Sequence, residues 1–201
     1  MKSIFITGSN GGIGSAIAKY FKNKNYKVVG LDLGKDINNL DAFFNIDLNN
    51  LVLQKNAREI FKKEVESIST EFDFHCLVNN AAIQITGSIK DMSTEDFVRT
   101  FNINTIAPFF LSKLFSGIFS KSNANIINIG SIHSKLTKQD FSAYAASKAA
   151  LLSLTKSLSI ELGQKIRVNS VQPAAVDTTM LRTGFRNNID LKDLKSNHPT
   201  N

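Results

Sequence analysis

The sequence predicts one α/β domain built on a doubly wound parallel sheet of about six strands. Short apolar runs alternate with longer amphipathic stretches, which is typical of repeated strand-helix-strand units. The runs are rich in Val, Ile and Leu, as strands that are covered on both faces require. A glycine-rich turn joins the first run to the first helical stretch. We therefore treat residues 1–201 as a single domain.

The elements follow one another in regular alternation. We expect strands over residues 3–7, 27–32, 42–46, 76–80, 125–130 and 167–171, where apolar runs of strand length occur. We expect helices over residues 12–24, 52–71, 94–119 and 141–162, where the apolar positions have helical spacing. Residues 178–201 are polar and without periodicity, so we expect an irregular region there.

Composition narrows the class of protein. Of the 201 residues, 42% are hydrophobic and 20% are charged, which suits a globular domain with a sizeable core. The single cysteine, Cys76, excludes an intrachain disulfide and fits a reducing compartment. No apolar run has the length of a membrane span, and the N-terminal run is too short for a secretory signal. We therefore expect a cytoplasmic protein without a membrane partner.

The net charge of +7 raises the possibility of a nucleic-acid partner. However, the lysines are scattered along the chain, and the aromatic residues are mostly Phe within apolar segments. This pattern favours a solvated basic surface, so we expect no nucleic-acid partner. We also expect no metal site.

The stretch IFITGSNGGIG combines a strand, a glycine-rich turn and the start of a helix. Gly8 allows the tight turn, Gly12 lets the backbone approach a ligand, and Gly14 lets the helix pack against the strand. The free N–H groups and the positive end of the helix dipole suit a phosphate. This arrangement indicates a Rossmann-type dinucleotide site that includes Gly8, Ser9, Asn10, Gly12, Ile13 and Gly14.

Asp32 ends the second predicted strand, in KVVGLD. A carboxylate at this point can accept hydrogen bonds from both ribose hydroxyls of an adenosine, and it repels a 2′-phosphate. Asp32 therefore favours NAD over NADP as the cofactor. Lys35 is the counter-argument, because a flexible lysine nearby could meet a phosphate. A turn or cap role for Asp32 is the structural alternative.

Tyr144 and Lys148 lie four positions apart in YAASK, so a helix places them on one face. A free phenol has a pKa of about 10 and is a poor base at neutral pH. A neighbouring cation lowers that pKa, which makes the pair a possible acid/base catalyst. Taken alone, the spacing also fits a half-buried tyrosine beside a solvated lysine.

Several motifs occur in order along the chain: TGSNGGIG, Asp47 in IDL, NNAA from Asn79 to Ala82, Asn104 in INTIAPFF, Ser131 in IINIGS, YAASK and RVNSVQPAAVDTTM. This ordered set resembles the short-chain dehydrogenase/reductase family over residues 3–180. The resemblance implies an NAD(P)(H)-dependent oxidoreductase that interconverts a secondary alcohol and a ketone. It favours the catalytic interpretation of YAASK over the structural one.

The resemblance also implies a role for each catalytic residue. Tyr144 would be the general acid/base, and Ser131 would bind and polarise the same substrate oxygen. Lys148 would lower the pKa of Tyr144 and bind the nicotinamide ribose. Asn104 would hold a water that links Lys148 to bulk solvent, with Asn102 as the competing candidate. Ser131 could instead cap the loop after its strand.

Further cofactor contacts are implied by position. Asp47 and Leu48 resemble the pair that contacts the adenine ring, and the segment with Asn80, Ala81 and Ala82 resembles the one beside the adenosine. Pro173, Val176 and Thr178 match positions that hold the nicotinamide carboxamide. Two residues depart from the family pattern, which commonly has Gly at Ala82 and at Ala174. We expect the loop at Ala174 to shift slightly, because Ala has less freedom than Gly at positive φ.

The substrate side is less defined. Ser131, Tyr144 and His133 are the substrate-contact candidates, although His133 could be a solvated loop residue. Gln139, Phe141 and residues 180–185 are similar candidates, and none of them identifies the alcohol or ketone.

The family architecture implies a seventh strand and a further helix after residue 201. The resemblance therefore predicts a sheet in which the usual seventh strand is missing, with an exposed sixth strand. The alternative function is a catalytically impaired or non-catalytic dinucleotide-binding module. The family often forms tetramers through two kinds of interface, one of which uses the two long predicted helices, 94–119 and 141–162, so we expect a homodimer through these helices.

Overall fold

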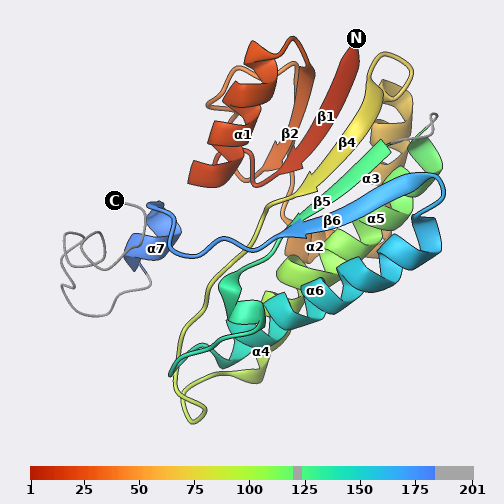
Figure 1. Cartoon of the computed structure of the whole chain (residues 1–201). Helices are drawn as coiled ribbons and strands as arrows, with labels where there is room; N and C mark the ends of the chain where they lie inside the picture. Colours follow the sequence, from red (N-terminus) through yellow and green to blue (C-terminus); the bar gives the residue numbers. More distant parts are fainter. Residues whose placement is uncertain (120–123, 184–201) are drawn as a thin grey trace.

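The computed structural model describes residues 1–119 and 124–183, which form a parallel sheet flanked by helices (Figure 1). Its six strands lie in the order β3-β2-β1-β4-β5-β6. They are β1 Lys2–Thr7, β2 Lys27–Asp32, β3 Ala42–Asn45, β4 Asp73–Asn79, β5 Ala124–Ile129 and β6 Ile166–Val171. Every pairing between neighbouring strands is parallel, which confirms the predicted doubly wound α/β fold.

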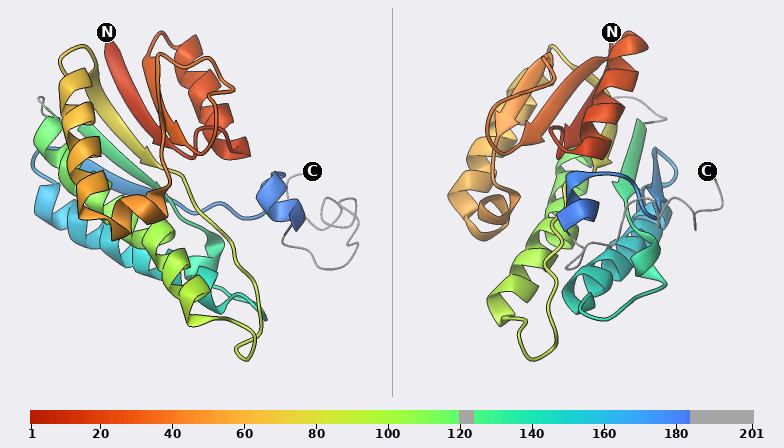
Figure 2. Two further views of the ribbon diagram at one scale, coloured as in Figure 1. Left: turned by 180° about the vertical axis from the view of Figure 1, so that it is seen from behind. Right: turned by 90° about the vertical axis from the view of Figure 1, so that its left-hand side faces the viewer.

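The helices are distributed unequally over the two faces of the sheet. They are α1 Gly12–Asn23, α2 Leu48–Leu53, α3 Lys55–Ile68, α4 Thr94–Phe101, α5 Ala107–Ile118, α6 Ser142–Leu162 and α7 Thr179–Thr183. Helices α2, α3, α5 and α6 cover one face, whereas α1 lies against the other (Figures 1 and 2). The larger core therefore lies on the side that carries α6.

Phe5 is the centre of the larger core. Its ring is fully buried in β1 and lies 4.9 Å from the ring of Phe115 in α5, measured between centroids. Its neighbours Ile4 and Ile6 point to the opposite face and pack against Ala18 of α1. Aromatic pairs of this kind contribute about 0.5–1.5 kcal/mol each beyond the area they bury. The other rings around Phe5 are those of Phe44, Phe61 and Phe74.

Strand β6 is covered on one face only by the described residues. Ile166 and Val168 are buried toward α6, whereas Arg167, Asn169 and Val171 are exposed on the other side. We had expected strands covered on both faces throughout. The polar residues at alternate positions of β6 explain the difference, because a strand with one solvated face needs apolar residues only on the other.

The helix predicted over residues 52–71 is instead two helices, α2 and α3. They are separated at Gln54, whose backbone is extended with φ −106° and ψ 112°. Arg58 stabilises the break, because its guanidinium donates to the backbone oxygens of Leu51 and Val52 at the end of α2. A side chain in α3 thus provides donors for carbonyl groups that a continuous helix would have paired internally.

The helix predicted over residues 94–119 contains a π-helical turn, Asn102–Ile106, between α4 and α5. The backbone N–H of Ala107 donates to the oxygen of Asn102, five residues earlier. Such turns occur mostly as single insertions in α-helices, often at functional sites.

The irregular region predicted over residues 178–201 begins with a short helix, α7, over Thr179–Thr183. Thr178 stabilises its start, because the Thr178 hydroxyl accepts a hydrogen bond from the N–H of Leu181 at 3.3 Å. The remainder of that region, residues 184–201, lies outside the described residues. No helix within the described ranges is long and apolar enough to span a membrane.

The strand order places the predicted functional residues at one edge of the sheet. The direction of winding reverses between β1 and β4, and all strands point the same way. Ligands of doubly wound sheets bind in the crevice at the carboxyl ends of the strands beside such a reversal. The segments that follow β1, β2, β4, β5 and β6 therefore meet there.

Candidate active site

A cavity of about 690 Å³ lies at the carboxyl edge of the sheet. Its volume is in the range of sites for small molecules and cofactors, about 300–1,000 Å³. The lining includes most of the predicted site residues: Gly8, Asn10, Gly12, Ile13, Asp32, Asp47, Leu48, Asn80, Ala81, Ala82, Ser131, His133, Tyr144, Lys148, Pro173, Val176 and Thr178. The chain thus brings together residues from segments that are far apart in the sequence.

The glycine turn between β1 and α1 is closed by backbone contacts. Gly8 has φ +67°, a conformation that side chains rarely tolerate, and its oxygen accepts a hydrogen bond from the N–H of Gly11 at 3.1 Å. A Cβ on Gly14 would lie 2.0 Å from the Gly8 oxygen, so only glycine fits there. Gly14 and Ser9 do not line the cavity, and they act in forming the turn.

The start of α1 is open to a ligand. Its N-cap, Gly11, provides no side-chain hydrogen bond, and the first turn contains no acidic residue. The N–H groups at a helix start then remain available to an anion, and the helix dipole adds to the attraction. This end of the cavity can hold a phosphate group.

Asp32 lies at the end of β2 and faces the glycine turn. Its two carboxylate oxygens accept hydrogen bonds from the N–H of Asn10 at 2.8 Å and of Leu33 at 2.7 Å. Each oxygen retains a lone pair, so the carboxylate can still accept from a ligand hydroxyl. Lys35 is exposed and does not line the cavity. The Asp32 carboxylate therefore lines this end of the site, whereas the Lys35 ammonium does not.

A clamp joins the ends of β1 and β4. The hydroxyl of Thr7 accepts hydrogen bonds from the N–H groups of Asn80 and Ala81, each at 3.0 Å. The Asn80 amide donates in turn to the oxygens of Thr7 and Gly8. Asn80 therefore holds the glycine turn in place while its segment lines the cavity. Thr7 was not identified from the sequence as a site residue.

Tyr144, Ser131 and Lys148 meet deep in the cavity. Both Ser131 and Tyr144 are buried, and the side chain of Ser131 acts on the phenol of Tyr144 so as to lower its pKa. The ammonium of Lys148 lies 5.8 Å from the centroid of the Tyr144 ring and donates to the oxygen of Ile129 at 2.8 Å. Helix α6 thus presents its Tyr-Lys pair to the end of β5, as the spacing predicts.

Burial controls the acidity of this group. Desolvation lowers the pKa of Lys148 from 10.5 to about 8, so the side chain still carries its charge at neutral pH. Desolvation raises the pKa of Tyr144, and the hydrogen bond from Ser131 opposes this effect. The direction for Tyr144 is opposite to the lowering that we expected. Burial therefore outweighs the contribution of Ser131, which favours the phenolate.

Asn104 lies in the π turn and is fully buried. Its amide oxygen accepts from the N–H of Ile83 at 2.9 Å, and its nitrogen donates to the oxygen of Ile83 and to the hydroxyl of Ser147, each at 3.0 Å. The side chain therefore joins the segment after β4 to helix α6, and it does not line the cavity. Asn102, the competing candidate for the relay role, donates a hydrogen bond to the side-chain oxygen of Asn49 in α2 instead.

Gln172 holds the loop that carries Ser131, a role that the sequence did not reveal. Its side-chain oxygen accepts from the N–H of Ser131 at 2.9 Å and from the hydroxyl of Ser134 at 3.0 Å. A Cβ on Gly130 would lie 2.4 Å from that oxygen, so glycine is needed for the approach. The sequence signal that could have revealed this role is the side-chain amide of Gln172, directly before the PAAVDTTM stretch.

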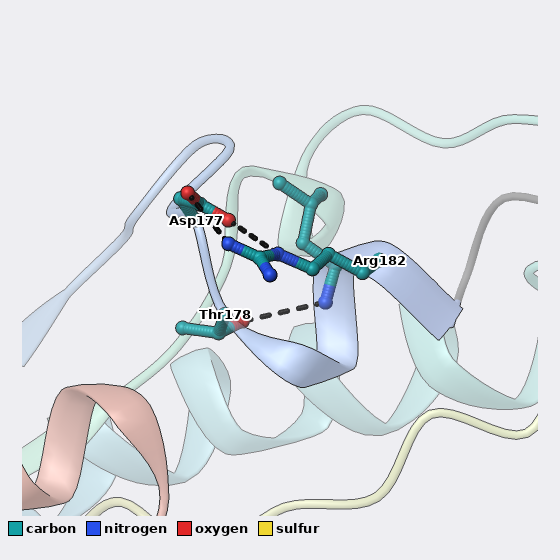
Figure 3. A network of polar contacts seen from close by, with 4 residues as sticks. Asp177, Thr178 and Arg182 are labelled. Atoms are coloured by element: carbon teal, nitrogen blue, oxygen red, sulfur yellow. Dashed lines mark hydrogen bonds and ion pairs between the residues drawn. The ribbon is translucent and has the colours of Figure 1, made fainter. Parts of the chain in front are cut away.

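The segment after β6 closes the cavity over the glycine turn. The methyl group of Thr178 approaches Gly12 so closely that a Cβ there would lie 2.8 Å away. The Arg182 guanidinium binds both carboxylate oxygens of Asp177, and the N–H of Arg182 donates to the oxygen of Thr178 at 3.1 Å (Figure 3). These bonds fix α7 against the loop. Ala174 has no positive φ, so the shift expected there is not needed.

The residues present fit a nicotinamide dinucleotide. The cavity offers a phosphate site at α1, a carboxylate for a ribose at Asp32, and an apolar wall beside Asp47 formed by Leu31, Ile46 and Leu48. The other end leads to Tyr144 and Lys148. Within the described ranges, no cluster of His, Cys, Asp or Glu side chains is arranged to hold a metal ion.

The chain is similar to several known proteins. The family model for short chain dehydrogenases matches residues 2–188. Carbonyl reductase (NADPH) 2 of Sus scrofa is 37% identical over 126 residues, which are 61% of this chain and 52% of that protein. The 3-oxoacyl-(acyl-carrier-protein) reductase FabG of Buchnera aphidicola subsp. Acyrthosiphon pisum is 30% identical over 202 residues, covering 98% of this chain and 82% of the relative.

A solved structure shares the fold closely. The 4-hydroxyisoleucine dehydrogenase mutant complexed with NADH and succinate superimposes with a TM-score of 0.85 at 32% identity. The match covers 98% of this chain and 83% of that chain. The match to carbonyl reductase 2 thus spans about half of that protein's length. The matches to FabG and to 4-hydroxyisoleucine dehydrogenase each span more than four fifths of the relative's length.

The buried ammonium of Lys148 predicts a pH-dependent stability. Between pH 8 and 10.5 the unfolded chain binds more protons at this residue than the folded chain does, so its contribution to the free energy of unfolding rises with pH. Relative to Lys148→Met, wild type should therefore gain about 3 kcal/mol across this window. Urea unfolding of the cofactor-free proteins at several pH values measures the difference.

Lys156→Met is the matched control, because Lys156 is exposed on the same helix. Its difference from wild type should stay constant with pH. A constant difference for Lys148→Met as well would contradict the buried, weakly basic ammonium.

Proposed function

The chain belongs to the short-chain dehydrogenase/reductase family, and from this premise we propose that it is an NAD(H)-dependent oxidoreductase that interconverts a secondary alcohol and a ketone. The observation that carries the proposal is that the buried side chains of Ser131 and Tyr144 lie in one cavity beside the buried ammonium of Lys148. This group lies in the same cavity as the glycine turn and Asp32. A small-molecule carbonyl compound or alcohol is therefore the proposed substrate.

Tyr144 is the proposed general acid/base. Its raised pKa keeps the phenol protonated at neutral pH, which suits donation of a proton to the carbonyl oxygen during reduction. Ser131 hydrogen-bonds the same oxygen and polarises the carbonyl. A nicotinamide cofactor, when bound, supplies the hydride to the carbonyl carbon or accepts it from the alcohol.

Lys148 stabilises the phenolate that Tyr144 becomes after giving up its proton. The ammonium is held by Ile129, so it does not need to reorganise during the reaction. In alcohol oxidation the phenolate accepts the proton, and this direction is therefore favoured by higher pH. Asn104 keeps α6 in register with the cavity wall through Ser147, and its role in a water relay remains a proposal.

NAD is the proposed cofactor, with NADP as the weaker candidate. The support comes from Asp32, whose carboxylate faces the position of the adenosine ribose and would repel a 2′-phosphate. The relatives differ in this respect, since NADH is bound in the 4-hydroxyisoleucine dehydrogenase structure and NADPH is named for carbonyl reductase 2. The proposed preference for NAD therefore rests on the Asp32 carboxylate and not on the relatives.

Replacing Tyr144 with Phe should abolish turnover, because it removes the proton donor and keeps the ring. We expect at least a 100-fold loss of kcat, the low end of general acid/base contributions of about 10²–10⁴. NAD binding by calorimetry should change little. Reduction of a panel of ketones with saturating NADH measures the effect. Unchanged turnover would remove Tyr144 from the mechanism, and wild type without turnover would favour a non-catalytic binding module.

Calorimetric titration with NAD and with NADP tests the cofactor proposal. Wild type should bind NAD more tightly, and Asp32→Asn should reduce the preference about tenfold, because it removes the charge but keeps an acceptor oxygen. Asp36→Asn, in the same loop but outside the cavity wall, is the control. Tighter binding of NADP by wild type would be contrary to the proposal and would direct attention to Lys35.

We also propose a homodimer through the helices that carry the site. Phe97, Val98, Ile106 and Phe109 expose apolar surface along α4, the π turn and α5, and Ile160 does so on α6. Large apolar side chains exposed on neighbouring elements suit an interface with a second copy of the chain.

The exposed ring of Phe109 gives a direct test of this dimer. Sedimentation at micromolar concentration should show a dimer that Phe109→Glu dissociates, because the change places a charge in the apolar contact. Ile89→Glu, at a residue 83% exposed in the loop after β4, should leave the dimer intact. A monomeric wild type would rule out this assembly.

A further inference from the structure

Two loops form the wall of the cavity beyond Tyr144. One follows β4 and the other follows β5, and the N–H of Gly87 donates to the oxygen of Asp140 across them at 3.0 Å. The first loop contributes Gln84 to the lining, and the second contributes Lys138. The link between the loops holds both side chains at the substrate end, away from the glycine turn.

Lys138 belongs to a compact group of side chains around Tyr144. Its ammonium lies 4.3 Å from the centroid of the Phe141 ring. That ring lies 6.0 Å from the ring of Tyr144 and 4.8 Å from the imidazole of His133. Besides burial, the charge of Lys138 contributes to lowering the pKa of His133, which supports the closeness of the two groups. The cation therefore lies against a ring that itself packs on Tyr144.

Charge is distributed unequally along the cavity. Among the described residues that line it, the carboxylates are Asp32 and Asp47, and both lie at the adenosine end. The substrate end has Lys138 and Lys148, and Lys148 lies beneath the tyrosine. Asp140 is near Lys138 in sequence but is not part of the wall. Among the described residues that line the substrate end, the charged side chains are thus both cationic.

Gln84 adds a hydrogen-bonding group to this end of the cavity. Its amide makes no hydrogen bond to another residue in the described part of the chain, although it lies in the wall. Specific sites typically combine an apolar wall with a few polar groups of this kind. Phe141, Met180 and Leu181 provide the apolar part.

Building on the proposed function, we propose that the substrate is a small oxo acid, or the corresponding hydroxy acid, whose carboxylate binds Lys138 and the amide of Gln84. In reduction, the oxo acid takes a hydride from NADH at its carbonyl carbon and a proton from Tyr144 at its oxygen. The products are the hydroxy acid and NAD, with the Tyr144 phenolate reprotonated from solvent. The carboxylate takes no part in the redox step and serves for recognition.

Matched substrates test this assignment. Straight-chain oxo acids with the carboxylate one to three carbons from the ketone are compared with their own methyl esters at saturating NADH. Wild type should show at least a tenfold higher kcat/KM for the acid than for the ester of the preferred length. In Lys138→Met the ratio of acid to ester should fall about 10- to 100-fold, as expected for loss of a charge-assisted hydrogen bond.

Lys135→Met is the matched control, because Lys135 is an exposed lysine of the same loop outside the cavity wall. Its acid-to-ester ratio should equal that of wild type. Turnover of esters as efficient as that of acids, or an unchanged ratio in Lys138→Met, overturns the carboxylate site and leaves the proposed oxidoreductase function intact.

A binding measurement separates failure of the site from failure of the proposed function. Quenching of bound NADH fluorescence reports binding of an oxo acid when all proteins compared also carry Tyr144→Phe, so that turnover does not consume the NADH. Binding that Lys138→Met weakens and Lys135→Met does not supports the carboxylate site even if no carbonyl compound is reduced. Equal binding by all three proteins, or none by Tyr144→Phe alone, contradicts it.

Discussion

The burial of one ammonium group, that of Lys148, constrains much of the structure around it. A buried charge is costly unless a fixed partner compensates it, and here the partner is the oxygen of Ile129 at the end of β5. That hydrogen bond requires α6 and β5 to keep a precise distance. Ser131 lies two residues after the end of β5 and Tyr144 precedes Lys148 by one helical turn, so the same constraint brings both side chains into the cavity.

Helix α6 is therefore fixed at several points along its length. Thr155 accepts from the Asn128 amide beneath the sheet edge at 2.9 Å, and Ser147 accepts from Asn104 at 3.0 Å. The oxygen of Ser147 also accepts from the hydroxyl of Thr105 in the π turn. These buried polar bonds add specificity to an otherwise apolar interface, since each is satisfied in one register only. Preorganisation of this kind is what an electrostatic catalyst requires.

The sequence predicted those features that depend on residues close together in the chain. The glycine turn and the helical pairing of Tyr144 with Lys148 depend on neighbours along the chain, and the parallel sheet depends on a strong pattern. The break at Gln54 was missed because it depends on Arg58 reaching carbonyl groups of another turn. The direction of the Tyr144 pKa was missed because burial is a property of the whole fold. The contacts of Gln172 with Ser131 and Ser134 could not be predicted, because loop residues have no hydrophobic periodicity that indicates their neighbours.

The π turn at Asn102–Ile106 makes the site sensitive to deletions within this helical segment. It accommodates one residue more than a regular helix would over the same length. A deletion of one codon within it would restore regular α-helical spacing, yet it would rotate Asn104 away from Ile83 and Ser147. Most helices on a protein surface tolerate such indels poorly because of packing alone. Here even a deletion that packed well would remove the support that Asn104 gives to the site.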